Sequence, residues 1–184
     1  DESLGLGDLN NDGQSEFFTY SAPIDSSVPG RFTIFQRRST FGSDVSDFFT
    51  KTVIENPNFI PSGASIYSYV VDDFNHDGLN DLACSLNDAR LEVLTGAGNF
   101  QFRDATFYVT NGPMIEGGDF NGDGVTDIAS MWASGFISFS VRPFASVLYG
   151  RTDGSFAPQT PISSSTDTTF SPVVGDFNGD GASD

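Results

Sequence analysis

Four short segments of this chain place oxygen-bearing side chains at the same spacing. They begin at Asp8, Asp73, Asp119 and Asp176 and read DLNNDGQSE, DFNHDGLND, DFNGDGVTD and DFNGDGASD. Each has Asp at position one, Asn at three, Asp at five, Gly at six and an acid at position nine. A hard cation such as Ca²⁺ takes roughly 6–8 oxygen ligands, and alternate residues of a tight loop can direct carboxylate and amide oxygens to one centre. We therefore predict four calcium loops, numbered 1 to 4 in chain order.

Each position of the loop has its own predicted role. The side chains at positions one, three and five supply oxygens, and glycine at six tolerates the positive φ that lets the chain reverse. Position seven would supply its backbone carbonyl, which explains why its side chain differs between loops, and the acid at nine closes the site. The predicted ligands of up to four Ca²⁺ ions are Asp8, Asn10, Asp12, Gln14 and Glu16; Asp73, Asn75, Asp77, Leu79 and Asp81; Asp119, Asn121, Asp123, Val125 and Asp127; and Asp176, Asn178, Asp180, Ala182 and Asp184.

Two other interpretations of these segments are weaker. Asp, Asn and Gly also mark ordinary turns, but four copies in the same register disfavour that explanation. An EF-hand shares the first half of the pattern, yet it needs Glu at position twelve and a helix on each side. Position twelve is Thr19, Cys84 or Ser130 in the three loops that reach it, and the flanking sequence has no helical period. Calcium binding of the helix-loop-helix type is therefore rejected.

The chain is strongly acidic. Its 184 residues include 25 Asp and Glu against 8 Lys and Arg, which gives a formal net charge of −17. Three acids lie in each loop, so four bound Ca²⁺ ions would offset about half of this charge. Because clustered carboxylates repel one another without metal, and because a ligand of the folded state stabilises it, we expect folding to depend on calcium. The negative field also argues against nucleic acid, which is bound through Lys and Arg at its phosphates.

The composition is that of a globular protein, and the predicted calcium loops suggest a place outside the cell. Apolar residues make up 38% of the chain and Phe occurs 19 times, which is enough for a packed interior. No segment approaches the roughly 20 apolar residues of a membrane helix, so we expect no membrane insertion. Cys84 alternates with Leu82 and Leu86 and is expected to be a buried, inert thiol. Calcium loops of modest affinity fill where calcium is abundant, so we expect a secreted or cell-surface protein.

Short strands are predicted between the loops. Period-two alternation bounded by turn residues is the signal used for each of them. The predicted strands are 16–21, 31–36 and 48–54; 66–71, 81–86, 91–94 and 102–109; and 114–118, 128–132, 146–148 and 159–162. The predicted repeats of the single domain 1–184 are 1–64, 65–111, 112–169 and an incomplete 170–184.

This organisation favours an all-β fold of the β-propeller type. Propeller blades are four-stranded sheets that recur about every 40–50 residues, and each loop then lies at the hairpin between the first and second strands of a blade. About three blades and the opening strand of a fourth do not close a ring, because propellers typically have 4–8 blades. Either the chain is a fragment of a longer propeller, which is the favoured alternative, or several copies complete one another.

The loops also resemble those of the FG-GAP and VCBS repeats. The segments LTGAGNFQF (94–102) and VLYGRTDGSFAPQTPI (147–162) are similar to the glycine-turn-phenylalanine segment that joins the third and fourth strands in that family. The resemblance spans nearly the whole chain and implies a calcium-binding β-propeller, as in integrin α chains and certain fungal lectins. The first repeat departs from the family pattern: its connection from Gln36, QRRSTFGSDVSDFF, lacks the clean turn, and its loop closes with Glu16 instead of Asp.

Nothing in the sequence is typical of an enzyme. His76 is the one histidine and sits at position four of loop 2, where a solvent-facing turn residue is expected. The chain has no nucleophile elbow, no phosphate-binding glycine loop and no His/Cys metal cluster. Paired acids of the glycosidase kind stay open as an alternative, because 25 acids always offer pairs whose separation the sequence does not show. The expectation is a protein without catalytic activity.

Two functions of different classes remain open. The first is an extracellular recognition module of the lectin kind, in which repeated blades engage glycans multivalently. The second is a structural or adhesion role, in which the chain engages other extracellular proteins or self-associates through open blade ends. The candidate glycan contacts are four aromatic residues, Trp132, Tyr149, Tyr67 and Tyr108. The alternative is that their side chains pack between blades.

Overall fold

The described part of the chain is built from strands and turns. A computed structural model describes residues 2–22, 30–38, 48–55, 60–61, 64–132, 145–163 and 173–184. These residues contain no helix, so the predicted all-β class is confirmed for them. None of these segments provides a helix long and apolar enough to cross a membrane.

The strands form three four-stranded antiparallel sheets, and each sheet is a simple meander in chain order. Blade 1 contains β1 (Glu2–Gly7), β2 (Glu16–Ser21), β3 (Arg31–Arg37) and β4 (Phe49–Glu55). Blade 2 contains β5 (Ile66–Asp72), β6 (Asp81–Leu86), β7 (Arg90–Gly98) and β8 (Gln101–Val109). Blade 3 contains β9 (Met114–Gly118), β10 (Asp127–Met131), β11 (Ala145–Leu148) and β12 (Thr160–Ser163).

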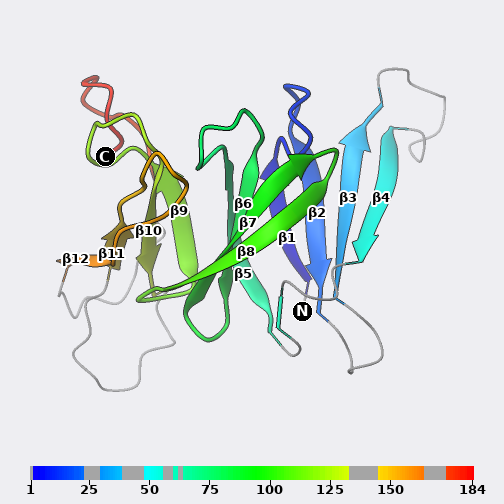
Figure 1. The fold of residues 1–184 in the computed structure, drawn as a ribbon, viewed down its shortest axis with the longest axis horizontal. Coiled ribbons are helices and arrows are strands. Elements are labelled where there is room, and N and C mark those ends of the chain that lie inside the picture. Colours follow the sequence, from blue (N-terminus) through cyan, green and yellow to red (C-terminus); the bar gives the residue numbers. More distant parts are fainter. Residues whose placement is uncertain are drawn as a thin grey trace.

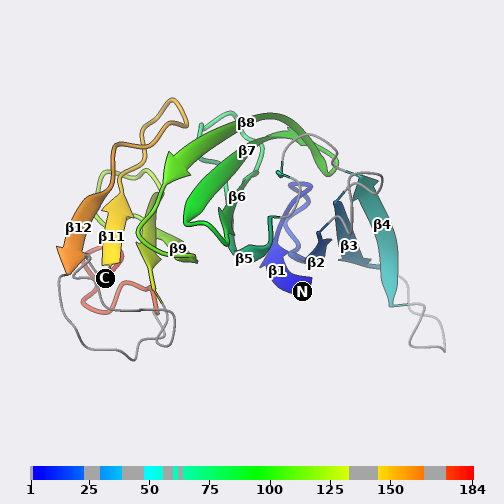
Figure 2. The ribbon, with the colours of Figure 1, turned by 90° about the horizontal axis from the view of Figure 1, so that it is seen from below.

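The three blades stand side by side as a fan (Figure 1, Figure 2). The first strands β1, β5 and β9 lie on the inner side of the arc, and β4, β8 and β12 lie on its outer side (Figure 2). Strand β5 contacts both β1 and β9, so the inner strands of successive blades are neighbours. This is the radial arrangement expected of propeller blades. Closure of a ring stays a prediction.

The core formed by the described residues consists of two layers, one between each pair of neighbouring blades. Aromatic and aliphatic side chains of blade 1 pack on Leu82, Leu86 and Leu94 of blade 2, and Leu91 and Val93 on the other side of blade 2 pack on blade 3. Burying one such Phe or Leu contributes about 1.5–3 kcal/mol. The blade 1 residues of the first layer are Phe18, Tyr20, Phe32 and Ile34, and the blade 3 residues of the second are Ile115, Ile128 and Leu148.

Blade 2 has both faces covered, which explains the unbroken burial of β6. Leu82 and Cys84 face blade 1, whereas Ala83 faces blade 3. The prediction that Cys84 is a buried thiol is confirmed, since its side chain is a free, fully buried cysteine. His76 is exposed, also as predicted.

Sequence patterns located most strands within two residues and missed one. Strand β1 was not predicted, although it pairs with β2 along its whole length. Residues 173–184 contain no strand, and residues 170–172, with which the predicted fourth repeat begins, fall outside the described residues. The irregular connection of the first repeat also falls largely outside them, at 39–47.

Candidate metal centre

All four acidic loops lie along one edge of the fan (Figure 1). Loop 1 joins β1 to β2, loop 2 joins β5 to β6, and loop 3 joins β9 to β10. Loop 4 lies within the last described segment, residues 173–184, which contains no strand. The first three loops therefore occupy the hairpin between the first and second strands of a blade, as predicted.

Each loop is closed by hydrogen bonds from its own backbone to the Asp at position one. In loop 1 the Asp8 carboxylate accepts from the N–H of Asp12 at 3.1 Å and of Gly13 at 2.8 Å. In the other loops the N–H groups at positions five and six donate in the same way to the Asp at position one, which is Asp73 in loop 2, Asp119 in loop 3 and Asp176 in loop 4. Since a carboxylate offers about four lone-pair sites, these bonds leave room for a cation.

Positions three, five and seven follow the same rule in every loop. The N–H at position five donates to the Asn side chain at three, and the N–H at seven donates to the Asp at five. The glycines at position six have φ values of 82°, 85°, 82° and 92°, in the left-handed region that glycine favours. The local sequence thus fixes one loop shape four times.

In loops 2 and 3 the acid at position nine accepts hydrogen bonds both from its own loop and from another part of the same blade. Asp81 accepts from the N–H of Phe74 at 3.1 Å and from the N–H of Gly96, at the end of β7, at 2.7 Å. Asp127 does the same in loop 3, accepting from Phe120 and from Gly150. This acid therefore connects its loop to the end of the third strand in blade 2 and to the turn just after the third strand in blade 3.

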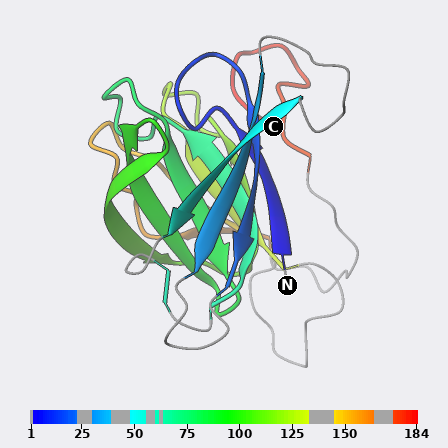
Figure 3. The same ribbon diagram turned by 90° about the vertical axis from the view of Figure 1, so that its right-hand side faces the viewer.

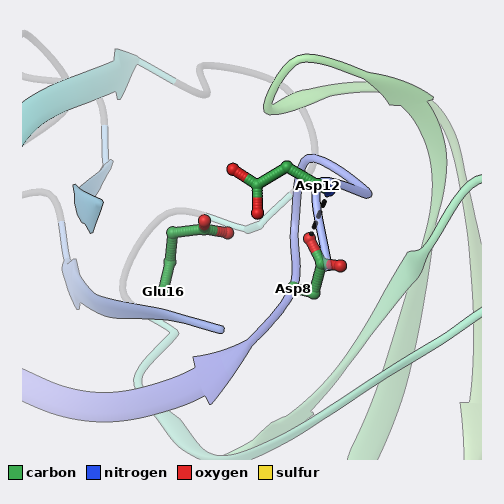
Figure 4. A group of neighbouring side chains, drawn as sticks. All are labelled: Asp8, Asp12 and Glu16. Carbon is green, nitrogen blue, oxygen red and sulfur yellow. Dashed lines mark hydrogen bonds between the residues drawn. The ribbon is translucent and has the colours of Figure 1, made fainter. Parts of the chain in front are cut away.

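Loop 1 is different, because its position-nine acid points back into the loop. Glu16 accepts from the N–H of Leu9 at 2.9 Å through Oε2, and its other oxygen, Oε1, is buried without a hydrogen-bond partner. The carboxylates of Asp8, Asp12 and Glu16 have oxygens within 4.8 Å of one another. Figure 4 shows the three side chains facing one another. Among the described residues, no other loop brings three acids this close.

The electrostatics of loop 1 reflect this crowding. Burial raises the pKa of Glu16 to about 7; the hydrogen bond from Leu9 opposes that rise, and the negative charges of Asp12 and Asp8 add to it. Burial also raises the pKa of Asp81 to about 6, although two backbone hydrogen bonds partly offset the effect. In loop 1 three carboxylates converge, and one of their oxygens, Oε1 of Glu16, has no hydrogen-bond partner. Such a set of oxygen donors suits a hard divalent cation.

Two residues outside the loops contact the acids at position five and were not found from the sequence. Gln36 donates to Oδ2 of Asp12 at 2.9 Å, and Arg103 forms an ion pair with Oδ2 of Asp77 at 2.7 Å. Both come from the third or fourth strand of the same blade. Only the strand register places them there, so the loop pattern contained no signal for either.

The four aromatic residues proposed as glycan contacts have different surroundings. Tyr108 packs edge to face on Phe156, with ring centroids 5.4 Å apart, and its hydroxyl accepts from the Phe156 N–H at 3.3 Å. It therefore belongs to the layer between blades 2 and 3. Tyr67 on β5 is 43% exposed, whereas Trp132 and Tyr149 are half-buried.

Comparisons with known proteins agree with this architecture. Residues 73–130 match the model of the FG-GAP-like repeat, so the suspected resemblance is confirmed for that segment. A solved structure of a lectin from Agrocybe aegerita, which specifically recognises non-reducing terminal N-acetylglucosamine, matches with a TM-score of 0.60 and 14% identity. The match covers 99% of this chain and 46% of the lectin, so the chain spans less than half of that protein's length. No curated protein matched the sequence. At this identity the likeness concerns the fold alone.

Proposed function

We propose that this chain is a calcium-stabilised recognition module that works outside the cell and binds carbohydrate without catalysing a reaction. The observation that carries the metal part is the buried, unpartnered Oε1 of Glu16 beside the carboxylates of Asp8 and Asp12. An unpaired buried carboxylate oxygen costs free energy that a bound cation would recover. The domain then needs the ion to hold its blade corners in place.

The ligand set follows from the loop geometry. In loop 1 the side chains of Asp8, Asn10, Asp12 and Glu16 and the carbonyl of Gln14 would hold the ion, which would supply charge neutralisation and rigidity. Loops 2 to 4 repeat the pattern, and we propose one ion for each, up to four in total. In these three loops both oxygens of the closing acid accept hydrogen bonds, whereas Oε1 of Glu16 accepts none, so loop 1 is the site that depends most on metal.

Carbohydrate recognition is supported by the fold likeness to a lectin that binds terminal N-acetylglucosamine. Tyr67 is the most open of the candidate aromatic contacts, and aromatic rings combine an apolar face with a polar edge that suits sugars. Repetition of the blade offers several weak sites, which together bind multivalent glycans more tightly than one site.

Calcium dependence is tested by thermal melting of the full chain with calcium or with a chelator. Saturation at 100-fold the Kd stabilises a folded protein by about 2.7 kcal/mol, so calcium should raise the Tm by several degrees. Glu16→Gln should lose a large part of this gain, while Asp104→Asn, which removes one exposed charge of β8 outside the loops, should keep it. An identical Tm with calcium and with chelator would remove the metal proposal.

Carbohydrate binding is tested separately, by titrating the calcium-loaded chain with oligosaccharides that end in N-acetylglucosamine. Binding should be competed by the free sugar and should weaken on Tyr67→Ala. The matched control is Phe107→Ala, because Phe107 is an exposed aromatic residue of the same blade, on β8, with 47% exposure. A chain that is calcium-loaded but binds no glycan on a broad array would leave the structural role as the surviving function.

Self-association is a second candidate function, and the open face of blade 1 favours it (Figure 3). Leu6 pairs with Phe17 in blade 1, as Val71 pairs with Leu82 in blade 2. Val71 and Leu82 pack against the preceding blade, whereas Leu6 and Phe17 are 60% and 44% exposed. The open face of blade 1 thus carries apolar residues at positions that are covered by a neighbouring blade in blade 2. We propose that a blade from a second copy of this chain covers this face.

A further inference from the structure

Loops 1 and 2 are joined directly by two asparagine side chains. Asn11 donates from Nδ2 to the carbonyl of Gly78 at 3.2 Å, and its Oδ1 accepts from the backbone N–H of Asn80 at 2.8 Å. Asn80 in turn donates from Nδ2 to the carbonyl of Asp8 at 2.6 Å. Three hydrogen bonds therefore connect loops that belong to different blades.

These bonds end on backbone groups next to the proposed ligands. Gly78 and Asn80 flank Leu79, whose carbonyl is the proposed ligand at position seven of loop 2, so Asn11 holds the peptides on either side of it. The carbonyl that Asn80 contacts belongs to Asp8, the first ligand of loop 1. Ordering either loop around an ion therefore restrains the backbone of the other, and the second ion meets a loop that has already lost part of its conformational freedom.

In the described part of the chain, the other loops lack such a pair of side chains that bond reciprocally between two loops; we call the three bonds of Asn11 and Asn80 the clasp. Position four is occupied by Gly122 in loop 3 and Gly179 in loop 4, which have no side chain to reach a neighbour. Loops 3 and 4 meet through one backbone bond, from the N–H of Ser183 to the carbonyl of Asp119 at 2.7 Å. Thr126 of loop 3 bonds to Asp72, which precedes loop 2. The reciprocal arrangement is thus a feature of loops 1 and 2.

We propose that loops 1 and 2 take up divalent cations as a coupled pair, with Asn11 and Asn80 as the positioning residues that transmit the coupling. This inference rests on the proposed function, because it requires that both loops bind metal. Coupling between two sites is reciprocal, and free-energy coupling in proteins typically changes affinity by about 5–150-fold. We expect an effect at the lower end of this range, about 5–10-fold, because three hydrogen bonds restrain only part of each loop.

The backbone angles supply an unusually clean variant. Asn11 has a φ of 62°, while glycines fill the same position of loops 3 and 4 with φ values of 74° and 81°. Asn11→Gly therefore removes two of the three hydrogen bonds of the clasp between the loops and keeps the backbone shape that loops 3 and 4 use. His76→Gly is the matched control, since His76 holds position four of loop 2 with a φ of 58° and its side chain is exposed.

The readout is loop-resolved calcium titration of the full chain by amide NMR. The N–H of Gly13 and of Gly78 each donate to the first carboxylate of their own loop at 2.8 Å, so their signals report loops 1 and 2 separately. Loop 1 is disabled with Asp12→Asn, and the calcium affinity of loop 2 is compared in the presence and absence of Asn11→Gly. We expect Asp12→Asn to weaken loop 2 about 5-fold or more when Asn11 is present and less than 2-fold in the Asn11→Gly background, with His76→Gly behaving as the unmodified chain.

The possible results separate a failure of the coupling between loops 1 and 2 from a failure of metal binding itself. If neither glycine signal responds to millimolar calcium, the proposed metal function is wrong. If both respond but Asp12→Asn leaves the affinity of loop 2 unchanged, the loops are independent and the coupling is refuted while metal binding stands. If Asn11→Gly does not fold, Asn80→Ser replaces it, because Ser occupies position eight of loops 1 and 4 and shortens the side chain that reaches Asp8.

Discussion

The backbone N–H of Gly96 donates a 2.7 Å hydrogen bond to Oδ1 of Asp81. This single contact joins the acidic loop of blade 2 to the end of its third strand, and Asp81 is buried at 2% exposure. The acid at position nine is therefore part of the blade as well as a proposed ligand. Its structural role can be tested without metal.

Asp81→Asn is expected to destabilise the chain in chelator-containing buffer at pH 5, where the raised pKa of about 6 keeps the Asp81 carboxyl largely protonated and the substitution removes little charge. The amide offers one acceptor oxygen where the carboxylate serves both Phe74 and Gly96, so one buried N–H loses its partner at a cost of about 1–3 kcal/mol. Urea denaturation measures the change. Asp88→Asn is the control, because its ion pair with Arg90 lies on the surface and contributes about 0–1 kcal/mol. Equal midpoints for the two variants would contradict a structural role for Asp81.

Gly150→Ala is expected to distort the junction between loop 3 and β11. A Cβ at Gly150 would clash with the carbonyl oxygen of Thr126, and overpacking of this kind costs about 1–3 kcal/mol. Gly175→Ala is the matched control, since a Cβ there would meet only the Phe177 ring at ordinary contact distances of 3.6–3.9 Å. Thermal melting in saturating calcium compares the two. If the Gly150→Ala and Gly175→Ala chains had the same Tm, the junction would accommodate the added methyl group without loss of stability, and the prediction would be wrong.

Glu92 is expected to make stability fall as the pH rises. Burial raises its pKa to about 8 from an ordinary value of 4.5, and the positive charge of Arg90 opposes the rise. Both carboxylate oxygens are buried without a partner. Between about pH 4.5 and 8 the folded chain keeps a proton on Glu92 that the unfolded chain releases, so this contribution is complete below pH 4.5 and lost as the pH passes 8.

Glu92→Gln is the corresponding variant, with urea denaturation at pH 5 and pH 9 in fixed calcium. The variant should lose less stability between these two pH values than the unmodified chain does, by more than about 1 kcal/mol. The titratable groups that interact electrostatically with Glu92 are Arg90, the Tyr20 hydroxyl and the Cys84 thiol, and burial raises the pKa of the last two, that of Tyr20 to about 12. They stay protonated across most of this range. Glu55→Gln, on the exposed end of β4, is the control, and a pH response equal to that of Glu92→Gln would refute the assignment.

Self-association should depend on the open face of blade 1. Leu6→Ser with Phe17→Ser replaces two exposed apolar side chains by polar ones, which should shift any concentration-dependent oligomer towards monomer in sedimentation velocity. The control is Val109→Ser, at the end of β8, since Val109 is 69% exposed but lies on another blade. A monomer at every concentration, or an oligomer that both variants leave intact, would exclude this face as the interface.

Local sequence was sufficient for the loops and for most strands. The hydrogen bonds that close a loop join residues two to five positions apart, such as Asp8 with Gly13 and Asp12 with Gln14. Alternation also predicted the strands around them, since the buried side chains of a strand recur at every second residue. Strand β1 was missed because its two glycines, Gly5 and Gly7, weaken the apolar pattern.

The sequence alone thus determined four acidic loops of one shape on an all-β scaffold, because those features depend on short-range bonds and on side-chain period. The tertiary structure decided which acids converge, since the unpartnered oxygen of Glu16 and the contact from Gln36 depend on how blade 1 pairs its strands. It also decided that Asn11 reaches loop 2 and that Glu92 is buried. Contacts between residues far apart in the chain exist only once the blades have packed, so no local pattern encodes them.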